Sequence, residues 1–124
     1  MEILDGKKLS AERILIAVGG VPNILEVEGM VENAITSNEA LDLDELPETI
    51  IVQGGGYIAL EFAGIFAALG SKTHLIYRSD LPLRGFDNDV REHIAKCLPD
   101  RGVMLHPNRS ITKVQKNSSK LSVF

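Results

Sequence analysis

Three consecutive glycines, residues 54–56, separate a short apolar run from a longer one. Residues 50–53 are typical of a buried strand, and residues 56–69 contain a single charged side chain and predict a helix. The series Gly54 to Ala59 fits the pattern G-x-G-x-x-G/A, in which the glycines permit a sharp turn and a close approach of the backbone to a pyrophosphate. Amides left free at the start of such a helix, together with its dipole, favour an anion. The turn therefore predicts a dinucleotide site, although glycine-rich turns also serve only as connections.

Strand-like and helix-like segments alternate from residue 49 onward. Strands separated by helices imply right-handed crossover units and a parallel sheet. The final segment, residues 111–124, predicts an antiparallel hairpin around Asn117. The fold class predicted for the chain is α/β, a Rossmann-like three-layer domain with a parallel sheet and an antiparallel hairpin or meander. The expected strands are residues 50–53, 73–77 and 103–106, and the expected helices are residues 56–69 and 88–98.

The first 47 residues carry weaker signals. Residues 1–9 predict a hairpin around Asp5-Gly6. The run at residues 13–18 is apolar throughout, which predicts a strand buried on both faces. The stretch from residue 19 to residue 47 is expected to be a connection with a short helix near residues 37–41.

The second helix has recognisable ends. Asp87 or Asn88 can accept hydrogen bonds from the amides of its first turn, and Pro99 with Gly102 is expected to end it. Cys97 falls on its apolar face and is expected to be a small buried core residue.

The second strand ends in Arg78-Ser79, and Arg84 follows. In a dinucleotide-binding fold an acid at this point accepts a hydrogen bond from the ribose of NAD, whereas an arginine accommodates the 2′-phosphate of NADP. Guanidinium groups donate paired, charge-assisted hydrogen bonds to a phosphate, which a carboxylate would repel. The pattern favours NADPH; the alternative is that both arginines are ordinary surface charges.

Composition excludes several other classes. The formal net charge of −4 argues against a basic nucleic-acid-binding surface. The longest apolar stretch, residues 56–70, is shorter than the roughly 20 residues that span a bilayer, so no membrane helix is expected. The start of the chain has no secretory signal, and the single cysteine excludes an internal disulfide, which together predict a cytoplasmic protein. The three histidines have no metal-site spacing and are expected to be structural or exposed.

Glu61 is the one acid of the predicted helix 56–69, which is apolar nearly all round and is therefore expected to lie between layers. The carboxylate is either solvated and stabilised by the helix dipole, or it faces a cofactor or a buried lysine. The local sequence leaves both interpretations open.

The segments "ILIAVGGVPN", "GGGYIALEFAGIFAALGSK" and "YRSDLPLRGFD" closely resemble the flavin-dependent pyridine nucleotide disulfide reductases of the glutathione reductase type. The resemblance implies a pyrophosphate turn, a 2′-phosphate site, a mobile aromatic ring over the flavin and two residues near the nicotinamide. The pyrophosphate turn falls on Gly54, Gly56 and Ala59, and the 2′-phosphate site on Arg78, Ser79 and Arg84. The mobile ring is that of Tyr57, and the residues near the nicotinamide are Ile58 and Glu61.

The resemblance also implies a division of the chain and a piece of a larger enzyme. Residues 1–45 resemble the end of the first half of an FAD domain with a linker, and residues 46–124 resemble an NADPH domain that lacks its last strand. The family's flavin fingerprint, cysteine pair and His-Glu pair are absent from these 124 residues. The expected function is NADPH binding within an enzyme that passes electrons through FAD to glutathione disulfide, with the remaining domains as partners. The chain alone is not expected to turn over or to bind FAD.

Two further expectations follow. Residues 13–18 are a candidate for the place of the missing strand beside residues 50–53, in the same chain or from a second copy; the second case makes a homodimer. The alternative function is a catalytically inert nucleotide-binding or structural fragment that self-associates.

Overall fold

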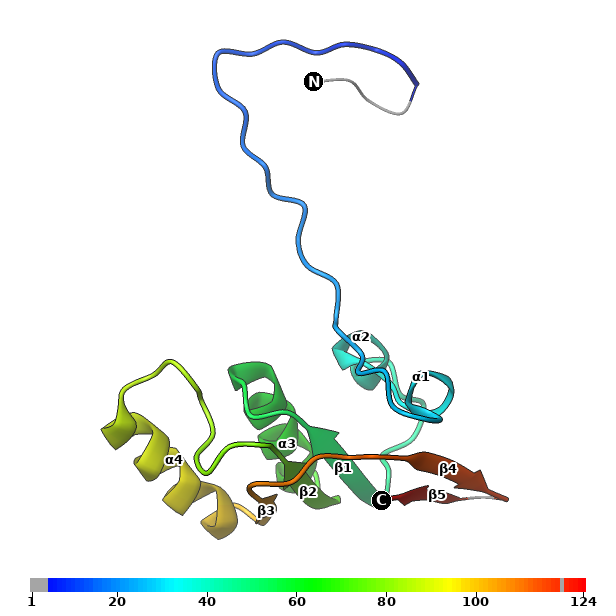
Figure 1. Cartoon of the computed structure of the whole chain (residues 1–124), viewed down its shortest axis with the longest axis vertical. Coiled ribbons are helices and arrows are strands. Elements are labelled where there is room, and N and C mark those ends of the chain that lie inside the picture. The colour runs from blue at the N-terminus through cyan, green and yellow to red at the C-terminus, as the bar shows by residue number, and fades with distance from the viewer. Residues whose placement is uncertain (1–4, 119) are drawn as a thin grey trace.

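A parallel three-stranded sheet organises the computed structural model, which describes residues 5–118 and 120–124 (Figure 1). The strands β1 (Thr49–Gln53), β2 (Lys72–Ile76) and β3 (Val103–His106) lie in the order β1-β2-β3. The helices α3 (Tyr57–Ala68) and α4 (Asn88–Asp100) form the two crossovers. The parallel α/β fold predicted from the alternation is therefore confirmed. Of the predicted hairpin at residues 1–9, residues 1–4 lie outside the described residues.

Both crossover helices pack on one face of this sheet. Leu75 of β2 and Val103 of β3 are buried there with Ala63 of α3 and Leu98 of α4. Side chains alternate along a strand, so Thr73 and Leu75 enter this core while His74 and Ile76 point to the opposite face.

A hairpin and a short helix cover part of the opposite face. The strands β4 (Val114–Asn117) and β5 (Lys120–Val123) pair antiparallel, and the helix α1 (Met30–Asn33) contacts β4. Met30, Ile111 and Val114 form a second core against Ile76. Helices, sheet and hairpin make the predicted three layers, and both hairpin strands lie within the predicted residues 111–124 (Figure 1).

The connection before β1 contains the expected short helix, α2 (Ser37–Ala40). Thr36 caps it: its hydroxyl accepts from the amide of Asn38, and Glu39 accepts from the amide of Thr36 at 2.7 Å. This reciprocal arrangement satisfies backbone donors at the start of the helix.

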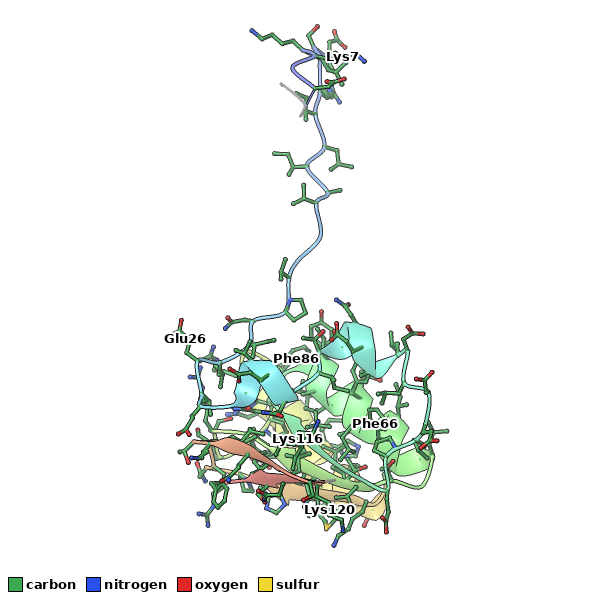
Figure 2. The ribbon with its side chains drawn as sticks, turned by 90° about the vertical axis from the view of Figure 1, so that its right-hand side faces the viewer. Lys7, Glu26, Phe66, Phe86, Lys116 and Lys120 are labelled. Atoms are coloured by element: carbon green, nitrogen blue, oxygen red, sulfur yellow. The ribbon has the colours of Figure 1, made fainter. Side chains whose placement is uncertain are left out.

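The prediction of a buried strand at residues 13–18 is wrong. These residues form no regular element, and Leu15 is 90% exposed. The extended chain that contains them leads away from the folded body toward Lys7 (Figures 1 and 2). A strand needs a neighbour for its backbone hydrogen bonds, and within the described part of the chain β1 pairs with β2 alone. The pairing of residues 13–18 with β1 inside one chain is thus contradicted, whereas pairing between two copies stays a prediction.

Three expectations for α4 also need correction. Asp87 is its N-cap residue but makes no side-chain capping hydrogen bond, and the amide oxygen of Asn88 accepts from Arg91 instead. The helix continues through Pro99 to Asp100, whereas Gly102, with φ +86°, follows the C-cap residue Arg101 and ends the helix as expected. Cys97 is half-buried rather than buried, with its Sγ 3.4 Å from Nε2 of His93.

The helix α3 is buried on one side only. Ala63 and Phe66 enter the core, whereas Ile58, Ile65 and Leu69 stand exposed. The expectation that this helix lies between two layers is therefore wrong for these residues. Among the residues that the structure describes, no helix is long and apolar enough to cross a membrane.

Candidate nucleotide site at the glycine turn

The glycine turn begins where β1 ends. Gly54 has φ +136°, a backbone conformation that glycine adopts without steric cost, and its amide donates to the carbonyl of Ile76 at 2.9 Å. A Cβ at this position would lie 3.2 Å from Cβ of Ala59, so Ala59 closes the first turn of α3 against Gly54. These contacts direct the chain sharply from strand to helix.

Gly55 joins the turn to the segment that follows β2. A Cβ on Gly55 would lie 3.2 Å from Cβ of Tyr77 and 3.8 Å from Cα of Pro82. Its carbonyl accepts a hydrogen bond of 2.6 Å from the amide of Leu83. The turn and residues 77–83 are therefore in direct backbone contact.

Gly56 is the N-cap residue of α3 and the most open part of the turn. It has φ −85° and ψ 171°, and a Cβ here would meet nothing within 4 Å. No side chain caps the helix, so its first amides remain available together with the positive end of the dipole. This geometry suits an anion that approaches the backbone from solvent.

The sequence-predicted charged residues border this turn. Arg78 directly follows Tyr77, and Arg84 directly follows Leu83, which are the first and last residues of the stretch that contacts Gly55; both arginines are exposed. In residues 5–118 and 120–124, no hydrogen bond or ion pair occupies either guanidinium group. Ser79 is half-buried, and its hydroxyl donates to the carbonyl of Leu81 at 2.7 Å. Two unpaired cations thus stand at the carboxyl end of the sheet, on the side of the glycine turn.

The three remaining predicted site residues lie at the start of α3. Tyr57 is 65% exposed, and Ile58 and Glu61 are also exposed. Of the two interpretations of Glu61, the solvated carboxylate matches its position in these 124 residues. Its place beside a nicotinamide stays a prediction.

Tyr77 lies against Gly55 of the glycine turn. Its side chain is buried in the main core, and burial, followed by the charge of Asp80, raises the pKa of its hydroxyl. An ordinary tyrosine is already neutral at physiological pH, and the shift acts in the same direction.

The sequence analysis missed a histidine pair on the opposite face of the sheet. Nδ1 of His74 lies 2.9 Å from Nε2 of His106, and the two rings stack with centroids 5.2 Å apart. Partial burial, then the charges of His106 and Lys72, lower the pKa of His74. Both side chains point away from the helix face, and His106 also lines an open cleft of about 350 Å³ beneath the hairpin with Ile76, Arg109 and Phe124. Only the parallel register of β2 and β3 brings the pair together, so no local sequence signal could reveal it.

The fold and its glycine turn define a Rossmann-like α/β domain of the flavoprotein reductase type. The chain belongs to the pyridine nucleotide-disulphide oxidoreductase family, whose sequence pattern it matches over residues 2–124. It is 47% identical over 112 residues to trypanothione reductase of Leishmania donovani, an alignment that covers 88% of this chain and 23% of that protein. It is 46% identical over 121 residues to the chloroplastic/mitochondrial glutathione reductase of Pisum sativum, covering 95% of this chain and 22% of that protein.

Solved structures agree with the fold. The HOCl-induced flavoprotein disulfide reductase RclA from Escherichia coli superimposes with a TM-score of 0.82 at 29% identity, over 98% of this chain and 28% of that one. An engineered water-forming NADPH oxidase bound to NADPH superimposes with a TM-score of 0.74 at 26% identity, over 85% of this chain and 25% of that one. The chain spans about a quarter of the length of these relatives.

Proposed function

We propose that residues 46–124 are the NADPH-binding domain of a flavin-dependent disulfide reductase of the glutathione reductase type. The observation that carries the proposal is the contact between the glycine turn and the segment bordered by Arg78 and Arg84. Two unpaired guanidinium groups beside an uncapped helix start provide positive charge for two separate phosphate groups.

Different residues of the chain bind different parts of NADPH. Gly54 and Ala59 shape the turn, and Gly56 leaves room for a pyrophosphate against the first amides of α3. Arg78, Ser79 and Arg84 surround the 2′-phosphate, with Ser79 able to accept or donate through its hydroxyl. Tyr57, Ile58 and Glu61 stand exposed along the start of α3, where a nicotinamide and a flavin of the complete enzyme would meet.

The engineered NADPH oxidase supports the choice of NADPH. Its substitutions introduce an arginine, a serine at the next position and a second arginine five positions after that serine, in the form bound to NADPH. Arg78, Ser79 and Arg84 have the same spacing. That oxidase also has an alanine in place of a glycine nineteen positions before the first arginine, the spacing of Ala59 to Arg78.

In the complete enzyme we expect NADPH to supply a hydride, bound FAD to accept it, and a disulfide such as that of glutathione to receive the electrons. The chemistry of hydride transfer belongs to the cofactors, while the protein supplies position and charge. The residues of this chain bind and orient the nucleotide. They do not include the dithiol, because Cys97 is the single cysteine.

Calorimetric titration of the full chain with NADPH and with NADH tests the proposal. We expect NADPH to bind more tightly, and Arg78→Glu to lower its affinity at least about tenfold, which corresponds to about 1.4 kcal/mol. The substitution places a carboxylate where the 2′-phosphate would lie and should weaken NADH binding far less. Absence of heat with both nucleotides, or equal affinity for the two, would contradict the proposal.

A second candidate function is self-association of an inert fragment. Leu15, Ile16 and Val18 are exposed on an extended segment, and β1 is an edge strand in the described part of the sheet. An extended apolar segment of one copy can add to such an edge in another. Analytical ultracentrifugation distinguishes the candidates: a dimer that Ile16→Lys converts to a monomer favours this one, and a monomer at all micromolar concentrations excludes it.

A further inference from the structure

Arg91 has an unusually buried side chain for an arginine. It lies in the first turns of α4, and only 16% of its side chain is exposed. Arginine is seldom buried unless its donors are satisfied, so its partners indicate what it holds in place.

The partners of Arg91 are mainly backbone carbonyls of the segment after β2. Its Nε donates to the carbonyl of Pro82 at 2.8 Å, and Nη2 donates to the carbonyl of Leu81 at 3.1 Å. Nη1 donates to Oδ1 of Asn88 at 3.1 Å, which fixes the plane of the guanidinium group. The rigid fork of arginine therefore holds two successive carbonyls at once.

These two carbonyls belong to the segment between Arg78 and Arg84, the residues proposed to bind the 2′-phosphate. The carbonyl of Leu81 also accepts from the hydroxyl of Ser79. Leu83, the residue after Pro82, donates its amide to the carbonyl of Gly55. Residues 78–87 form no helix or strand, so their conformation depends on such contacts. Arg91 thus connects α4 to the segment that carries Ser79 and, at its two ends, Arg78 and Arg84.

Arg91 also affects the charge of the site. Asp80 is the one acid between Arg78 and Arg84 in the sequence. Its Oδ1 accepts from the amide of Leu81 at 2.8 Å and lies 3.7 Å from Nη2 of Arg91. Because the contact is long and the Asp80 side chain is 79% exposed, Arg91 offsets only a small part of this negative charge.

We propose that Arg91 is a positioning residue for NADPH selectivity: it holds residues 79–83 so that Arg78, Ser79 and Arg84 converge on the 2′-phosphate. The inference rests on the proposed function. No sequence signal singled out Arg91, because its partners are main-chain atoms nine and ten residues away.

The experiment compares Arg91→Lys and Arg91→Gln in the full chain with the matched control Arg101→Gln. Arg101 is an exposed arginine at the other end of the same helix. Lysine keeps the positive charge but loses the fork, so it separates positioning from simple attraction. Titrations with NADPH and with NADH give the ratio of the two affinities, and hydrogen exchange reports the amide of Leu83.

We expect both Arg91 variants to lower NADPH affinity about tenfold and NADH affinity by no more than about twofold. The Leu83 amide should exchange about tenfold faster in both, and Arg101→Gln should change none of these quantities. A general loss of folding would lower both affinities together and leave their ratio unchanged. The ratio is therefore the readout that a merely structural role would not move.

Two contrary results have different meanings. An NADPH preference that survives both Arg91 variants, or that Arg91→Lys retains in full, overturns the inference alone. A wild-type chain that binds neither nucleotide, or both equally, contradicts the proposed function and overturns the inference with it.

Discussion

At the scale of single residues, Gly54 and Gly56 of the same turn serve different purposes. Gly54 has a positive φ and contacts Ala59, so its lack of a side chain serves the fold. Gly56 has an ordinary φ and open space around it, so its lack of a side chain leaves room for a ligand. Substitution by alanine should therefore affect mainly folding at Gly54 and mainly ligand binding at Gly56.

We expect Gly54→Ala to lower the free energy of unfolding by about 1–3 kcal/mol, because alanine strains the backbone at this φ and crowds Ala59. Gly56→Ala should lower that free energy by only about 0.5–1 kcal/mol, because glycine is preferred over alanine at an N-cap. It should nevertheless weaken NADPH at least about tenfold, because the added methyl group occupies the space next to the first amides of α3. Urea unfolding and calorimetry measure the two effects; equal stability losses in both variants would contradict this division.

At the scale of elements, the central strand β2 contributes side chains to both faces of the sheet. Leu75 on one face is fully buried between α3, α4 and the sheet, while His74 on the other face meets His106 of β3. One strand therefore connects the main core to the histidine pair. Each face leads to a separate prediction.

Leu75→Ala should destabilise the chain by about 2–5 kcal/mol, because it leaves a cavity where the two helices meet the sheet. The control is Leu69→Ala, which removes a leucine that is 62% exposed at the end of α3 and should cost under about 0.5 kcal/mol. Urea denaturation checks both values. Similar costs for the two leucines would show that the core is not centred on β2.

The stability of the chain should decrease as the pH falls from neutral through the ordinary histidine pKa near 6.5. The pKa of His74 is lowered in the folded chain by burial and by His106 and Lys72, so the unfolded chain binds a proton that the folded chain resists. His74→Gln should flatten this dependence, and His93→Gln, on the exposed side of α4, should leave it intact. Thermal unfolding at several pH values between neutral and mildly acidic tests the sign; a stability that rises on acidification would contradict it.

The whole molecule divides into a folded body and an extended segment (Figure 1). Lys7 lies far from the body (Figure 2), and residues 13–18 are exposed. Arg91, in contrast, is held by four nitrogen–oxygen contacts. Proteolysis follows local exposure and backbone freedom. The two parts should therefore differ strongly in their susceptibility.

Trypsin should cleave after Arg13 well before it cleaves after Arg91. Cleavage at Arg13 should leave the thermal midpoint of the remaining body within a few degrees, about the effect of less than 1 kcal/mol. Mass spectrometry of timed digests, followed by thermal unfolding, gives both results. Protection of Arg13 at high protein concentration would instead favour the paired form with a second copy.

The sequence by itself determined the alternation of β1, α3, β2, α4 and β3 and the glycine turn, because these depend on local periodicity and on backbone conformations that few residues adopt. It also placed Arg78 after β2, at the same edge of the sheet as the glycine turn after β1, since parallel strands end at one edge. Only the tertiary structure decided that residues 13–18 are exposed and that α3 is covered on one side. It alone also brought His74 to His106, and Arg91 to the carbonyls of Leu81 and Pro82. Those outcomes depend on which partners are present across long sequence separations, and a strand or a buried charge is stable only where a partner satisfies it.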